Sequence, residues 1–108
     1  MSTTILFNNQ PVTSGNDFLL NLTLLTDGVP TDITGATLTA SFEVAGTEYI
    51  TAHAVTIVSA AAGTCSITVT AAENDMVAGT CQFDVKMVKA GVVRHFGPGQ
   101  FTVRTALT

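Results

Sequence analysis

The fold is decided by residues 18–44, which read FLLNLTLLTDGVPTDITGATLTASFEV. At both ends of this stretch, apolar residues occupy every second position, and most of the positions between them hold threonine, asparagine or serine. Alternation with a period of two is typical of a β-strand that is buried on one face. Asp27-Gly28, followed by Pro30, predicts a turn, because these residue types favour turn conformations. The stretch therefore predicts two half-buried strands joined by a turn.

The same alternation recurs further along the chain, in residues 65–69, 81–87 and 101–103. Turn signals such as Ala45-Gly46 and Ala90-Gly91 separate the segments. A strand and a turn about every 8–12 residues are typical of an all-β sandwich, and we expect about seven antiparallel strands. The predicted strands lie near residues 3–8, 17–26, 35–45, 48–58, 63–70, 80–89 and 92–105.

Two local features interrupt this pattern. Gly97-Pro98-Gly99 falls inside the last strand, and because proline cannot donate a hydrogen bond to a neighbouring strand, we expect a β-bulge or an edge position there. Thr70-Ala71-Ala72-Glu73 has the capping-box pattern and predicts one short helical turn. The sequence contains no repeat, linker or low-complexity tract, so we expect residues 1–108 to form a single domain.

The composition excludes several classes of function. The chain has four basic and eight acidic residues, and its charged fraction of 11% compares with about 25% in an ordinary soluble domain. Four scattered cations cannot form the basic stripe of a nucleic-acid-binding protein. No apolar stretch approaches the length of about 18 residues that a membrane span requires. We see no secretory signal and expect synthesis in the cytoplasm.

We predict no catalytic, cofactor-binding or metal site, and therefore no enzyme. His53 and His95 fall on different predicted strands and outside any metal-ligand spacing. The acidic residues are scattered, whereas a calcium site needs a dense run of oxygen ligands. A small hydrolase would require a pocket that brings a histidine to a nucleophile, and nothing in the spacing indicates one.

The two cysteines, Cys65 and Cys81, share the inward-facing parity of their predicted strands. We expect them to behave as small buried hydrophobic residues. If their two strands are neighbours, the thiols could lie close enough to form a disulfide, and the sequence leaves this alternative open.

The surface is expected to be unusually poor in charge. The mean hydropathy is +0.44, and the two lysines, Lys86 and Lys89, fall on one predicted strand, although edge strands are commonly protected by lysine. Apolar residues also fall at outward positions, and large apolar surfaces normally mark interfaces. We therefore expect edges or faces of the domain to be covered by a neighbour. The candidate interface residues are Leu19, Leu25, Val88, Ile5, Phe7 and Leu107.

Residues 18–42 resemble a module of tailed bacteriophages, the N-terminal domain of phage baseplate upper proteins. The resemblance rests on Thr26-Asp27-Gly28-Val29-Pro30 and on the corner Asp32-Ile33-Thr34-Gly35-Ala36-Thr37. The closing Gly99-Gln100-Phe101-Thr102-Val103 is similar to the last strand of that family. The resemblance implies a single immunoglobulin-like β-sandwich that serves as a virion building block, with no catalytic residues.

These observations favour a structural, non-enzymatic protein of a tailed-bacteriophage virion, made in the cytoplasm of the bacterial host. It would dock through β-edges and uncharged faces to itself, as a homo-oligomer, or to other virion proteins. The tail, the baseplate and the head surface, as a capsid decoration, are the alternative locations. The alternative function is a glycan-binding or adhesion module that contacts the host surface through Tyr49, His53 and the turn carboxylates.

Overall fold

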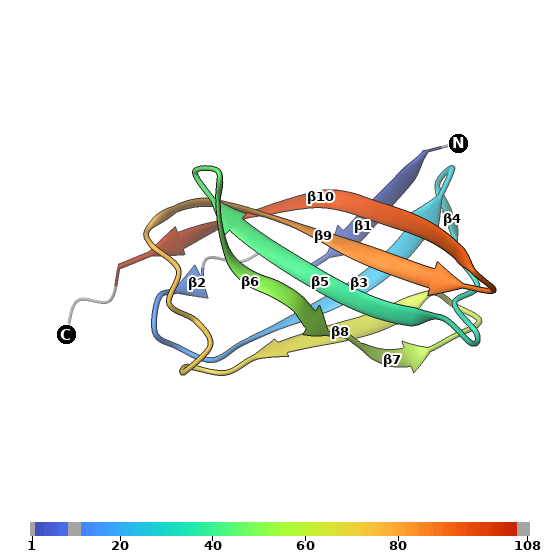
Figure 1. The fold of residues 1–108 in the computed structure, drawn as a ribbon, viewed down its shortest axis with the longest axis horizontal. Helices are drawn as coiled ribbons and strands as arrows, with labels where there is room; N and C mark the ends of the chain where they lie inside the picture. Colours follow the sequence, from blue (N-terminus) through green and yellow to red (C-terminus); the bar gives the residue numbers. More distant parts are fainter. Residues whose placement is uncertain (1, 9–11, 106–108) are drawn as a thin grey trace.

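Two β-sheets face each other in the computed structural model, which describes residues 2–8 and 12–105 (Figure 1). We call them the β3 sheet and the β9 sheet, each after one of its inner strands. The β3 sheet consists of β1 (Thr3–Phe7), β3 (Phe18–Thr26), β8 (Thr64–Val69) and β7 (Thr56–Ser59) in that order, with β4 (Val29–Pro30) also paired to β3. The β9 sheet consists of β2 (Val12–Thr13), β10 (Val92–Arg104), β9 (Gly79–Lys89), β5 (Thr37–Val44) and β6 (Thr47–Ala54).

The sandwich forms because each long strand has one apolar side. On β3, for example, Leu20, Leu22 and Leu24 are buried, while Leu19 and Asn21 between them are exposed. The strands pair in antiparallel fashion except β2, which runs parallel to β10. This order is the immunoglobulin arrangement, in which strands A, B, E and D form one sheet and strands G, F, C and C′ form the other. The predicted all-β antiparallel sandwich is confirmed.

The prediction of a single strand over residues 48–58 is wrong. β6 pairs with β5 in the β9 sheet, whereas β7 pairs with β8 in the β3 sheet, so the chain changes sheets at Val55. The Val55 side chain is half-buried against the core, and no glycine or proline marks the crossing. The two-residue strands β2 and β4 are too short to show periodicity. The described residues therefore form ten strands where about seven were expected.

Two irregularities interrupt the pairing in the β9 sheet. The register between β9 and β10 shifts between Phe96 and Gly99, which confirms the predicted bulge; the Gly97-Pro98 peptide within it is cis. A Cβ atom at Gly99 would lie only 2.4 Å from the Phe83 ring, so only glycine fits there. The second irregularity lies in the β5–β6 pairing, where Ala52 adopts a positive φ of 51°.

Phenylalanine rings from both sheets meet in the core. Phe18 of the β3 sheet packs against Phe42 and Phe101 of the β9 sheet, with ring centroids 6.1 and 5.8 Å apart. Phe83 stacks on Phe42 at 5.5 Å and meets the edge of Phe7 at 5.0 Å. These separations lie in the favourable range for aromatic pairs. The aromatic cluster therefore joins the two sheets.

Cys65 and Cys81 are both free and buried. Cys65 lies on β8 and Cys81 on β9, in opposite sheets, so their strands are not neighbours within a sheet. Burial raises the pKa of Cys65 to about 11 and that of Cys81 to about 12. Both thiols are therefore protonated at neutral pH and behave as the small core residues that the sequence predicts.

The predicted helical turn is present as one hydrogen-bonded turn between β8 and β9. The Asn74 amide donates to the Thr70 carbonyl at 3.0 Å, and both the amide and the hydroxyl of Thr70 donate to Glu73 Oε1 at 3.0 Å. The turn does not continue into a helix. The Thr70 amide, the Thr70 hydroxyl and His53 hold the pKa of Glu73 below its ordinary value.

Phe42→Ala should lower the free energy of unfolding by about 3–5 kcal/mol, because it leaves a cavity at the centre of the aromatic cluster. Urea denaturation followed by circular dichroism measures the change. Val92→Ala, at a half-exposed position next to the β9–β10 turn, is the control and should change the free energy by less than about 0.5 kcal/mol. Equal effects of the two variants would contradict the central role of the cluster.

Acid should destabilise the protein partly through Glu73. Because its pKa is lowered in the folded state, its contribution is present above the ordinary value of 4.5 and is lost as the pH falls through the folded-state pKa. Glu73→Gln should therefore reduce the loss of thermal stability measured between pH 5 and pH 3 (about the titration range of carboxyl groups). Asp32→Asn should do the same independently, since the hydroxyl and amide of Thr34 lower the pKa of Asp32. An unchanged acid slope in both variants would contradict this account.

Candidate interaction surface

The outer side of the β3 sheet carries no charged side chain among the residues that the structure describes. On β1, β3 and β8, the outward residues alternate with the inward ones. On β7, Thr56 is outward because it pairs with the outward Ser66. Seven of the outward residues are threonine, serine or asparagine and three are leucine. We call this surface the neutral face, and it comprises Thr4, Leu6, Leu19, Asn21, Thr23, Leu25, Thr56, Thr64, Ser66 and Thr68.

The leucines of the neutral face are open to solvent to different degrees. The side chain of Leu6 is 63% exposed and that of Leu19 is 44% exposed, while Leu25 is half-buried. Leu6 lies opposite Thr23, and Leu25 is two residues further along β3, so the two leucines are diagonal neighbours. Leu19 and Leu25, predicted as interface residues, therefore share one face.

The other predicted interface residues lie elsewhere. Ile5 and Phe7 point inward from β1 and pack against the core, and Leu6 between them is the exposed residue of that strand. Residues 5, 6 and 7 are all apolar, so no alternation in the sequence marks Leu6 as the outward residue. Val88 is half-buried in the β9 sheet beside Val93. Leu107 lies outside the described residues.

β7 forms one free edge of the β3 sheet. It pairs with β8 on one side, and all four of its residues are exposed, including Val58 at 66%. The strand contains no charge and no proline, which are the features that usually discourage edge-to-edge pairing. The neutral face thus ends at an edge that is open to a further strand.

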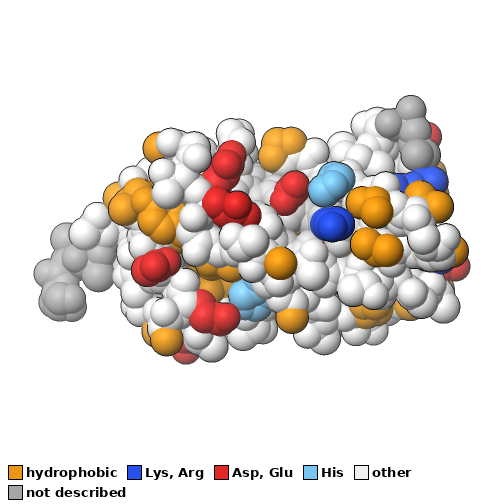
Figure 2. All heavy atoms as spheres, viewed as in Figure 1, with side chains coloured by type: hydrophobic (Ala, Val, Ile, Leu, Met, Phe, Trp, Pro, Cys, Tyr) orange, Lys and Arg blue, Asp and Glu red, His pale blue; other side chains and the backbone are white. Residues whose placement is uncertain are grey.

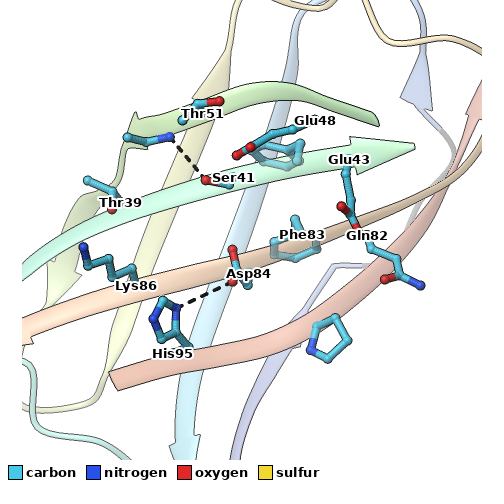
Figure 3. Close-up of a pocket in the computed structure, with 13 residues that line it drawn as sticks. Thr39, Ser41, Glu43, Glu48, Thr51, Gln82, Phe83, Asp84, Lys86 and His95 are labelled. Carbon is cyan, nitrogen blue, oxygen red and sulfur yellow. Dashed lines mark hydrogen bonds and ion pairs between the residues drawn. The ribbon is translucent and has the colours of Figure 1, made fainter. Parts of the chain in front are cut away.

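The outer side of the β9 sheet is hollowed. A depression of about 480 Å³ lies over the buried rings of Phe42 and Phe83. The irregular segments of the sheet border it on opposite sides, with Ala52 of β6 on one and Pro98 of β10 on the other. The Ala52 amide donates to Ser41 Oγ at 3.3 Å (Figure 3). The two bulges therefore shape this hollow.

The hollow is predominantly acidic. Glu43 lies directly opposite Glu48 across the β5–β6 pair, and like charges at this spacing repel each other. Asp84 lies on β9 with its Oδ2 atom 3.7 Å from His95 Nδ1, and Lys86 is the basic side chain of the lining (Figure 3). Figure 2 shows acidic side chains gathered on this side of the molecule. The two outer sides of the sandwich therefore differ sharply in charge.

Tyr49 and His53, predicted for glycan binding, do not line the hollow. Tyr49 is half-buried against the core. The His53 side chain is only 13% exposed; its Nδ1 atom lies 2.8 Å from the Ala54 carbonyl and its Nε2 atom 3.2 Å from Glu73 Oε2. His53 therefore ties the end of β6 to the turn at residues 70–73. The structure does not bring these residues together with the hollow.

The described part of the chain contains no group of three histidine, cysteine or acidic side chains placed to hold a metal ion. It also contains no helix long and apolar enough to cross a membrane.

No protein-family model matches the sequence, and no curated protein matches it. Among solved structures, a chain from "Structural basis of T cell specificity and activation by the bacterial superantigen toxic shock syndrome toxin-1" aligns with a TM-score of 0.52 and 14% identity, covering 94% of this chain and 98% of that one. The titin M1 domain aligns with a TM-score of 0.44 and 9% identity, covering 97% and 95%. The human B7-H4 IgV-like domain aligns at 0.36 and 12% identity, covering 97% and 98%. At these identities the likeness concerns the fold alone, and the protein has an immunoglobulin-like β-sandwich fold.

Proposed function

We propose that the protein is a structural, non-enzymatic component of a tailed-bacteriophage virion. It docks to other virion proteins, or to further copies of itself, at the tail, the baseplate or the head surface. The observation that carries this proposal is the neutral face, where ten outward residues of one sheet include no charge.

The charge pattern supports docking through this face. Interface centres are depleted of charged residues, because burying an unpaired charge is unfavourable. Exposed Leu6 and Leu19 add apolar area that association would remove from water. The free edge of β7 offers main-chain hydrogen bonds to a partner strand. The resemblance of residues 18–42 to the phage module supplies the virion as the setting.

A non-enzymatic role agrees with the state of the reactive groups. The two thiols are buried and protonated, so neither is a ready nucleophile. His53 is held by Ala54 and Glu73, and His95 lies in an open hollow without a neighbouring thiol in its lining.

The experiment is to locate the protein in phage particles and to test the neutral face there. Particles are purified from cells producing the phage and labelled with antibody and gold for electron microscopy. Label should appear at one defined place on the particle. Thr68→Lys, at an exposed position of the neutral face, should reduce the label at least tenfold, because a buried unpaired lysine weakens docking by about 1.4 kcal/mol or more.

Thr102→Lys is the matched control for this experiment. Thr102 is an exposed threonine on β10 of the opposite sheet, and the same substitution there should leave the label unchanged. Particles without label, or equal loss in both variants, would contradict the proposal.

A glycan-binding role is the second candidate, and the hollow of the β9 sheet favours it. Its volume lies within the range of about 300–1,000 Å³ of small-molecule sites, and its carboxylate, amide and hydroxyl groups suit sugar hydroxyls. A glycan array should then show binding that Gln82→Ala abolishes and Thr102→Ala preserves. An array without signal would exclude this role for the glycans it displays.

A further inference from the structure

We propose that the neutral face binds the neutral face of a second copy of this chain, which forms a two-fold symmetric dimer with the two β3 sheets packed against each other. This inference rests on the proposed docking role of that face and identifies its occupant.

The first argument is electrostatic. The chain carries a net charge of -4, so two copies repel each other wherever their acidic groups meet. A contact through the β9 sheet would bring Glu43, Glu48 and Asp84 of one copy against the same residues of the other. The neutral face contributes no charge to such a contact, and its approach to a copy of itself requires no desolvation of ions. The charge distribution therefore favours this side for self-association.

The second argument is the chemistry of the polar residues. In a two-fold contact, the same surface patch occurs on both partners, so each residue type must be able to pair with its own kind. Hydroxyl and amide groups are both donors and acceptors of hydrogen bonds, whereas carboxylates only accept and ammonium groups only donate. The threonine, serine and asparagine residues of the neutral face satisfy this requirement. A face built to recognise a charged foreign partner would instead carry charges of the opposite sign.

The third argument is size and shape. The four strands have five, nine, six and four residues, so at about 3.3 Å per residue and about 4.8 Å between strands the face covers roughly 400 Å². This is about half of the roughly 800 Å² per partner of a standard interface, a size typical of a weak dimer that exchanges with its monomers. Two sheets that pack face to face lie about 10 Å apart with interdigitating side chains, and Leu6, Leu19 and Leu25 would provide the apolar contacts.

Sedimentation equilibrium of the purified full chain over a concentration series tests the dimer. The wild-type protein should show a monomer–dimer equilibrium, with a limiting mass twice the 11.2 kDa of one chain. Thr68→Lys places an unpaired lysine of each copy in the contact and should raise the dissociation constant at least tenfold. Thr102→Lys should leave it unchanged. Circular dichroism and thermal unfolding establish that both variants are folded.

Three outcomes would overturn the inference: a wild-type protein that stays monomeric, a limiting mass other than that of a dimer, or equal weakening by Thr68→Lys and Thr102→Lys. The particle-labelling experiment separates this failure from failure of the proposed function. A monomeric protein whose Thr68→Lys variant no longer labels phage particles would dock to a foreign protein through the neutral face. A dimer that is absent from particles would retain the inference and contradict the virion role.

Discussion

Contact between phenylalanine rings holds the two sheets of this protein together, and the remaining structure is arranged around it. Many immunoglobulin domains link their sheets by a disulfide packed on a tryptophan. Here both cysteines are free, the sequence has no tryptophan, and rings from opposite sheets meet at centroid distances of 5.0 to 6.1 Å. The tight approach of Gly99 to the Phe83 ring belongs to the same constraint, because a side chain at that position would displace the ring. The bulge in β10 is thus adjacent to the aromatic cluster.

A core filled from the inward positions leaves the outward positions free to differ between the sheets. In a strand, each inward residue has outward neighbours, so the buried set also defines the two outer faces. The acidic residues Glu43, Glu48 and Asp84 fall on the outer side of the β9 sheet, and the neutral face falls on the other. This segregation is the property of the molecule that bears most directly on what it binds.

Much of the fold could be predicted from the sequence, because period-two alternation is a local signal. The alternation at residues 18–24 and 38–44 identifies β3 and β5 and their inward sides. The change of sheet at Val55 could not be predicted, since neither glycine nor proline marks it. The neutral face and the hollow depend on which strands are neighbours, and pairings such as Leu19 with Thr68 or Glu43 with Glu48 join residues that no local pattern connects.

The same segregation of charge separates two modes of binding. If the neutral faces of two copies pack together, the acidic sides of both β9 sheets point away from the contact, and each hollow stays open to solvent. A dimer of this kind would present two identical acidic surfaces on opposite sides, where their like charges are kept apart. Self-association through the uncharged sheet would therefore leave the hollow, the candidate glycan site, accessible in both copies.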